Sequence, residues 1–344
     1  LLDDPETPGT LPKVGPSLRY LSSKVSFDWL YSWLRNPMDF RPSTKMPRFF
    51  GLWDHLSGAG LAESQRYEPI EIRSIIAYLD AASAPFEYVA PYEGITAEQD
   101  PERGRKVFQV RGCLACHQHE EFPEATNNQG PDLSRIGAKL SSHPNGEAWL
   151  YSWLREPGRY HPKTLMPNVL LEPVTLADGM VSDPAADATA WLMQSTQDWQ
   201  PTDIPAADAL TADERAATEE LAALYLEGRF TKDKAHDYSI NGLPESMATI
   251  GGDESMLVGL SAGEATRDRQ LLEYVGKKTI GKLGCYSCHA IPGFEDAKPA
   301  GAALADWGRK ESSKIAFEQI VPYVMKELGG HAHGGDEEHA KHAS

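Results

Sequence analysis

Cysteine and long apolar runs are scarce in this sequence. Its 344 residues include four cysteines, all within residues 111–120 and 283–292. No stretch approaches the roughly 18 to 20 consecutive apolar residues that a membrane-spanning helix needs, so we expect no membrane span in this segment. The opening LLDDPETPGT has no initiator methionine, basic flank or apolar signal core. We therefore expect an internal segment of a longer precursor, with any targeting signal upstream.

Basic residues are also few. The sequence has 33 lysines and arginines against 50 aspartates and glutamates, which gives a net charge of −17. This balance disfavours nucleic acid and anionic membranes as partners and favours a partner protein with a basic docking face. An acidic surface that serves only solubility is the alternative. With 41% apolar residues, the chain has enough material for a core in each of two or three domains.

The cysteines form two copies of one motif, GCLACH at residues 112–117 and GCYSCH at residues 284–289. Two disulfides, or one zinc site built from both cysteine pairs, would leave the adjacent histidines unexplained. Neither copy has the flanking strands of a thioredoxin-like redox site. Both copies match the Cys-x-x-Cys-His attachment site of a c-type haem.

The spacing explains this chemistry. Cysteines three residues apart share one face of a helical turn, so both thiols can bond to one porphyrin edge while the next histidine reaches the iron. We expect one haem c on Cys113 and Cys116, and another on Cys285 and Cys288. Attachment of this kind takes place outside the cytoplasm, so we expect a periplasmic or otherwise extracytoplasmic protein.

The sequence also contains an internal repeat, because residues 14–50 match residues 129–170. Both copies contain Gly-Pro-x-Leu, then WLYSWLR-x-Pro, then Met-Pro. The second copy follows the first cysteine motif, and residues 100–195 resemble a class I c-type cytochrome domain. The resemblance implies an all-α domain with a middle helix over 146–156 and a C-terminal helix over 184–195.

The same resemblance implies roles for single residues of the second copy. Met166 would be the axial ligand opposite His117, rather than a methionine that only packs in the core. The carbonyl of Pro131 would accept the second ring proton of His117 and orient the imidazole. Trp153 and Arg155 would reach the haem propionates, the alternatives being a core tryptophan and a surface arginine.

The first copy has the corresponding Pro16, Trp33, Arg35 and Met46 and a helix over 69–82, but no cysteine motif before it. We interpret it as the rear part of a haem domain. Met46 would then face a third haem. The cysteines and histidine that hold this haem would come from residues upstream of Leu1 or from another chain. A haemless relic is the alternative.

A third copy contains the front part of the repeat, with the second cysteine motif, but not the rear part. After His289 it has a Gly301 to Leu304 counterpart of Gly-Pro-x-Leu, but no Met-Pro follows. Met325 is expected to pack in a core rather than to bind iron. The tail contains four histidines and could be a linker, a metal site or the source of an iron ligand. They are His331, His333, His339 and His342.

We therefore predict an all-α protein of tandem class I cytochrome c domains joined by loop-rich and helical linkers. The predicted parts are a rear domain part (1–95), a complete domain (96–198), a helical and glycine-rich linker (199–270), and a front domain part with its histidine-rich tail (271–344). Electron transfer in an extracytoplasmic respiratory chain, within a larger complex and without catalytic residues, is the predicted function. A dihaem peroxidase and a structural or sensory haem subunit are the alternatives.

Overall fold

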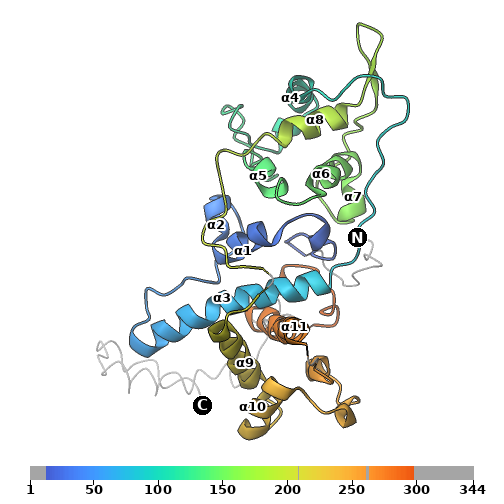
Figure 1. Ribbon diagram of the computed structural model, residues 1–344. Coiled ribbons are helices and arrows are strands. Elements are labelled where there is room, and N and C mark those ends of the chain that lie inside the picture. Colours follow the sequence, from blue (N-terminus) through green and yellow to red (C-terminus); the bar gives the residue numbers. More distant parts are fainter. Residues whose placement is uncertain (1–12, 208, 261–262, 298–344) are drawn as a thin grey trace, which may run out of the picture. The chain divides into compact units, whose positions relative to one another are not determined.

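The computed structural model describes residues 13–207, 209–260 and 263–297. These residues belong to one compact unit, in which helices dominate and a single two-stranded antiparallel sheet pairs β1 (Val174–Thr175) with β2 (Val181–Ser182) (Figure 1). The prediction of an all-α fold is thus confirmed. Within the described ranges, no helix has both the length and the apolar character that crossing a bilayer requires.

Residues 97–199, which we name the central domain, contain six helical segments. They are α4 (Pro101–Val110), the short 3-10 turn η2 (Cys113–Ala115), α5 (Ile136–Leu140), α6 (Gly146–Arg155), α7 (Pro157–Tyr160) and α8 (Pro184–Leu192). The predicted helices over 146–156 and 184–195 are confirmed as α6 and α8. Both α4 and α8 begin with Pro at N1 after an aspartate whose side chain accepts backbone N–H groups of the first turn.

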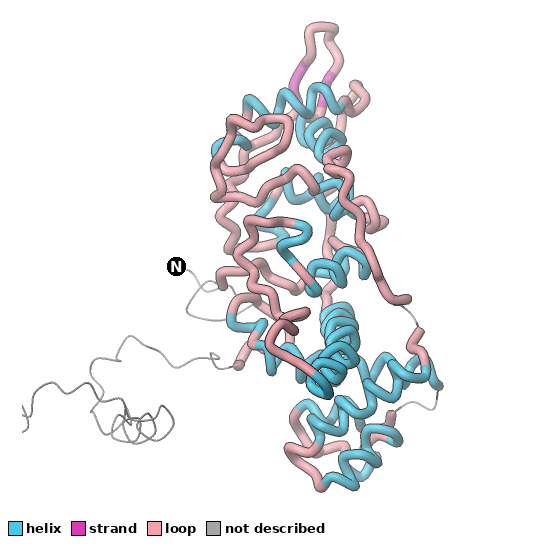
Figure 2. Tube along the Cα trace, turned by 90° about the vertical axis from the view of Figure 1, so that its left-hand side faces the viewer, coloured by secondary structure: helices cyan, strands magenta, loops and turns pink. Residues whose placement is uncertain are grey.

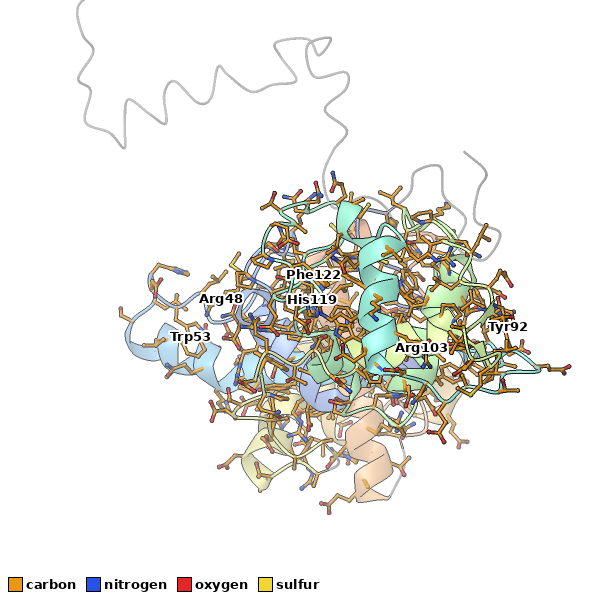
Figure 3. All side chains as sticks on the ribbon, turned by 90° about the horizontal axis from the view of Figure 1, so that it is seen from above. Arg48, Trp53, Tyr92, Arg103, His119 and Phe122 are labelled. Atoms are coloured by element: carbon orange, nitrogen blue, oxygen red, sulfur yellow. The ribbon has the colours of Figure 1, made fainter. Side chains whose placement is uncertain are left out.

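Helices α4 and α8 cross closely in the central domain. Gly104 makes the crossing possible, because a Cβ there would overlap the backbone carbonyl of Asp187. Arg103, labelled in Figure 3 beside the turquoise helix near the centre, also pairs with the Asp187 carboxylate at 2.9 Å. The crossing sets the attachment turn η2, which directly follows α4, against the domain core.

The first copy of the repeat folds into η1 (Leu21–Ser23), α1 (Phe27–Arg35), α2 (Pro37–Phe40) and α3 (Gly58–Ala81). Helices α1 and α2 correspond to α6 and α7. The helix predicted over 69–82 is present as α3, but it begins eleven residues earlier, at Gly58, and contains Pro69 in its interior. Proline is typical of the first turn of a helix rather than its interior, so the sequence predicts a helix that starts at Pro69.

Helix α11 (Glu264–Leu283) leads into the second cysteine motif and its turn η5 (Cys285–Ser287). It packs along α3, as the two adjacent ribbons of Figure 1 show. Gly276 of α11 lies against the backbone carbonyl of Ser74, just as Gly104 lies against Asp187. The rear part of the first copy and the front part of the third therefore pack together as one domain, which we name the split domain (residues 13–84 and 264–297).

The segment predicted as a linker contains α9 (Ala212–Leu226), α10 (Lys232–Asn241) and the turns η3 (Glu245–Met247) and η4 (Asp253–Leu257). Thr211 and Glu214 form a complete capping box at the start of α9. This segment buries its own apolar core against α11, and Figure 2 shows its helices from a second direction. It is thus a packed helical element rather than a plain connection.

Several sequence-based expectations concern the masked C-terminal part of the chain. The counterpart of Gly-Pro-x-Leu from Gly301 to Leu304, the role of Met325 and the histidine-rich tail all lie outside the described residues.

Candidate functional site

The first cysteine motif closes onto the Gly-Pro-x-Leu loop of the central domain. The His117 ring places Nδ1 2.8 Å from the carbonyl oxygen of Pro131, and the Gly130 N–H donates to the Cys116 carbonyl at 2.7 Å. A Cβ on Gly130 would overlap the imidazole of His117. Glycine is therefore required here by close approach of the ring to the backbone.

The electrostatic surroundings keep His117 neutral. Desolvation lowers its pKa, the Pro131 carbonyl partly opposes this, and the charge of Arg41 lowers the pKa further. A carbonyl oxygen only accepts, so Nδ1 carries the proton and Nε2 keeps its lone pair. This is the tautomer that binds a metal through Nε2.

The second cysteine motif closes in the same way onto the first copy of the repeat. His289 Nδ1 lies 2.8 Å from the carbonyl oxygen of Pro16, although 273 positions separate the two residues. Gly15 N–H donates to the Cys288 carbonyl at 2.8 Å, and a Cβ on Gly15 would overlap the His289 ring. Desolvation lowers the pKa of His289 as well, against the opposing effect of the Pro16 carbonyl.

This pairing corrects one expectation from the sequence. We expected the cysteines and histidine facing Met46 to come from residues before Leu1 or from another chain, with a third haem. The structure instead sets the chain's own Cys285 to His289 segment against Pro16. The described residues thus form two His–Pro closures, whereas the sequence predicts three haem sites.

Each predicted methionine packs in the same apolar cluster as the attachment segment of its domain. Met46 and Cys285 pack against the same buried cluster, and Met166 and Cys113 pack against another. Both backbones make the same local turn, because each methionine N–H donates at 3.2 Å to a threonine hydroxyl two residues earlier. One difference separates the copies: Trp33 Nε1 donates to Met46 Sδ at 3.0 Å.

The predicted tryptophans line these clusters, whereas the guanidinium groups of the predicted arginines are engaged in other contacts. Trp33 and Trp153 are partly buried beside the methionines. Arg35 donates to the carbonyl of Thr202 at 2.9 Å. Arg155 stacks on Tyr92, with its guanidinium 3.3 Å from the ring centroid. These contacts do not support the predicted role of the two arginines at the propionates.

Two further tryptophans were missed. Trp29 and Trp149 stack on Trp33 and Trp153, and both pairs have an interplanar angle of 16°. Their side chains are 4% and 3% exposed, and their indole N–H groups have no hydrogen-bond partner among the described residues. A buried N–H without a partner costs about 1–3 kcal/mol. The presence of both tryptophans at the same position of the repeat is the feature of the sequence that could have identified them.

The four cysteines, all within the described residues, form no disulfide with one another. Desolvation by burial raises the pKa of Cys285 to about 11 and also raises that of Cys113. Within the part of the chain that the structure describes, no three His, Cys, Asp or Glu side chains gather as a metal site. The two motifs do not combine into one zinc site.

These features fit a haem c in each domain. A cysteine pair for two thioethers, a neutral imidazole with a fixed tautomer and a methionine sulfur are the groups that such a haem uses. The unpartnered indole N–H groups supply donors for its carboxylates.

His119 lies close to the first motif but has a structural role. It is 3% exposed, its Nε2 lies 2.8 Å from the Ser195 hydroxyl, and its Nδ1 accepts from the Glu121 N–H at 3.2 Å. Figure 3 shows His119 beside Phe122. Both ring nitrogens are thus in use, and no lone pair remains for a metal.

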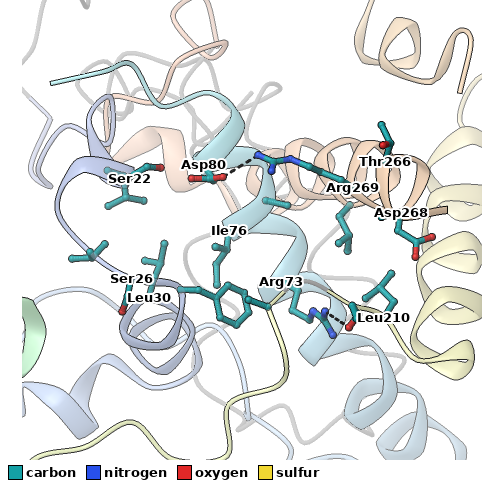
Figure 4. A pocket seen from close by; sticks show the side chains of 18 residues that line it. Ser22, Ser26, Leu30, Arg73, Ile76, Asp80, Leu210, Thr266, Asp268 and Arg269 are labelled. Carbon is teal, nitrogen blue, oxygen red and sulfur yellow. Dashed lines mark hydrogen bonds and ion pairs between the residues drawn. The ribbon is translucent and has the colours of Figure 1, made fainter. Parts of the chain in front are cut away.

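No residue of either cysteine motif lines the cavity shown in Figure 4. It lies between α1, α3 and α11, and its charged side chains already pair. Arg269 contacts Asp80 at 3.0 Å, and Arg73 contacts Glu214 at 2.8 Å. This cavity offers no group for a reaction.

Comparison with known proteins identifies the central domain. Residues 101–196 match the family model of cytochrome c, whereas searches of curated proteins and of solved structures found no match. The central domain is thus a c-type cytochrome domain, and this implies covalently bound haem c and haem-based electron transfer. The split domain lies outside the matched range, and its assignment depends on its geometry.

Proposed function

We propose, from the cytochrome c domain at residues 101–196, that the whole chain is a dihaem electron carrier. One observation carries the proposal. In both domains the histidine of the Cys-x-x-Cys-His motif places its Nδ1 2.8 Å from the carbonyl oxygen of the proline in Gly-Pro-x-Leu. In both domains the N–H of the glycine before this proline donates to the carbonyl of the second cysteine. The same closure made from two distant parts of the chain supports a second haem in the split domain.

His117 and Met166 would hold the haem iron of the central domain, and His289 and Met46 would hold that of the split domain. Each proline carbonyl accepts the histidine Nδ1 proton, so that Nε2 would keep its lone pair for the iron. A thioether ligand raises the reduction potential, because soft sulfur favours the ferrous state. When bound, the haem supplies one-electron chemistry, and the protein orients the ligands and excludes water.

We further propose an extracytoplasmic site of action in a respiratory chain, because haem c is attached outside the cytoplasm. The net charge of −17 favours a redox partner with a basic docking face. The chain would belong to a larger respiratory complex.

Haem counting and one substitution test the proposal. Pyridine haemochrome analysis should give two haems per chain, both covalent in haem-stained denaturing gels. Met46→Ala should remove about half of the sulfur-to-iron absorption of the ferric protein and lower one of two reduction potentials. Met166→Ala should do the same for the other haem.

Met180→Ala is the control, because this exposed methionine lies near β2 and should leave the absorption intact. One haem per chain would contradict the dihaem assignment. Full sulfur-to-iron absorption in Met46→Ala would show that Met46 only packs in the core.

A dihaem peroxidase is the rival function, and it needs one iron with an open sixth position. The packing of Met46 against the same buried cluster as Cys285 favours a carrier, because it offers a sixth ligand to the second haem. A fully low-spin ferric spectrum that does not react with hydrogen peroxide is expected. A high-spin fraction that reacts would favour the enzyme. A structural or sensory subunit would transfer no electrons to a partner.

A further inference from the structure

The split domain and the central domain meet through equivalent loops. His143 Nε2 donates to the Ser22 carbonyl at 2.9 Å, and the hydroxyls of Ser26 and Ser142 lie 2.7 Å apart. Both loops follow the Gly-Pro-x-Leu motif of their own domain. The two haem sites are therefore joined through corresponding parts of the repeat.

Across this contact each domain extends one lysine side chain onto a tryptophan of the other domain. Lys24 of the split domain places its Nζ 3.8 Å from the ring centroid of Trp149 in the central domain. Lys139 of the central domain places its Nζ 4.2 Å from the centroid of Trp29 in the split domain. Each lysine stands eight residues after the proline of its own Gly-Pro-x-Leu motif. The exchange is thus reciprocal, and the lysines occupy equivalent positions.

Each lysine therefore reaches the haem site of the opposite domain. Trp149 belongs to the buried core that also contacts Met166 and Cys113. Trp29 belongs to the core that also contacts Met46 and Cys285.

A third cation joins the lysines. The guanidinium of Arg41 lies 5.6 Å from the ring centroid of Trp33. Desolvation, with added repulsion from Arg41, lowers the pKa of Lys24 to about 7. Desolvation, with repulsion from Lys24 and Arg41, also lowers the pKa of Lys139. Three desolvated cations that repel one another are unfavourable unless an anion lies between them.

The described residues supply no such anion in direct contact. Among them, no carboxylate oxygen lies within ion-pair distance of Lys24, Lys139 or Arg41, and Asp132 acts on Arg41 only from farther away. Arg41 Nε has no hydrogen-bond partner, and neither do the indole N–H groups of Trp29 and Trp149. The interface thus combines positive charge with unused donors, which is the chemistry that binds carboxylates.

We propose that Lys24, Lys139 and Arg41 form one shared site that binds propionate carboxylates of both haems, each lysine serving the haem of the opposite domain. This inference rests on the proposed dihaem function. Its consequence is electrostatic coupling. A cation beside a propionate neutralises negative charge that would otherwise favour the ferric iron, so the loss of one lysine lowers the potentials of both haems.

Redox titration of the haem-loaded full chain tests this. Lys24→Met and Lys139→Met each remove a charge and keep much of the side-chain volume. Either change should lower both midpoint potentials, by about tenfold in the reduction equilibrium for the haem of the opposite domain, or ~59 mV. Lys24→Arg should restore the potentials toward the parent values. The matched control is Lys234→Met, which removes the same charge from an exposed position on α10.

The two lysine changes should also be non-additive in the double variant, because they share one site. Unchanged potentials in both single variants would overturn the inference, and so would a shift confined to one haem. Lower thermal stability with unchanged potentials would show that the lysines only pack on the tryptophans. The haem count distinguishes failure of this inference from failure of the proposed function. Two haems per chain with unchanged potentials would refute only the shared site. One haem per chain would refute the dihaem carrier.

Discussion

Gly15 and Gly130 are residues at which the two His–Pro closures leave no room for an added carbon. In each case a Cβ would lie against the imidazole of the ligand histidine rather than against a flexible chain end. The histidine ring cannot retreat without losing its hydrogen bond to the Pro16 or Pro131 carbonyl. The glycine thereby sets how closely the loop approaches the ring.

Gly15→Ala is expected to destabilise the haem-loaded protein by about 1–3 kcal/mol, the usual cost of overpacking. It should also perturb the haem proposed for the split domain, since the His289 ring must move. Denaturant unfolding measures the first effect, and the ferric absorption spectrum measures the second.

Gly60→Ala provides the control for this prediction. Gly60 lies in the first turn of α3 with nothing within 4 Å of an added Cβ, so stability should stay the same or rise by up to about 1 kcal/mol. Equal behaviour of the two variants would mean that the His289 ring does not lie against Gly15 in solution.

At the scale of secondary structure, both domains use one helix crossing. In the central domain α4 crosses α8 at Gly104, and in the split domain α11 crosses α3 at Gly276. In each case the glycine faces a backbone carbonyl of the partner helix. The chain order is reversed, because α3 precedes α11 whereas α4 precedes α8. Packing of helices does not depend on which one comes first in the sequence.

Gly276→Ala should therefore weaken the split domain. The added methyl group would meet the Ser74 carbonyl and the Tyr78 side chain, so the helices must separate, with a loss of about 1–3 kcal/mol. Thermal unfolding followed by circular dichroism should show a lower midpoint.

The matched change on the same helix is Gly281→Ala. Its Cβ would meet only Phe294 at ordinary van der Waals distance, and alanine favours a helix interior by about 1 kcal/mol over glycine. Stability should then rise. A gain of similar size in both variants would show that α11 does not lie on α3 through Gly276.

For the molecule as a whole, the testable feature is its net charge. The net charge of −17 predicts that electron transfer to a basic redox protein is steered by long-range attraction. The second-order rate constant should fall as salt rises, because the screening length shortens to about 8 Å at 0.15 M ionic strength. Stopped-flow measurements over a salt series provide the test. A rate that is independent of salt, or that rises with it, would contradict a basic docking face.

The local chemistry was readable from the amino-acid sequence. The spacing within GCLACH and GCYSCH determines the attachment turns, since cysteines three apart share a helical face whatever surrounds them. Helices α6 and α8 and the capping box at Thr211 also followed from nearby residues. Each of these features depends on interactions within one or two helical turns.

Only the tertiary structure decided which parts of the chain complete each other. The sequence showed a first copy without a front and a third copy without a rear, yet no local pattern joins Pro16 to His289. Their contact exists because α11 buries its apolar face on α3, far away in the chain. The exchange of Lys24 and Lys139 depends on the same long-range packing. Such contacts are selected by the burial of complementary surfaces, which neighbouring residues in the sequence do not encode.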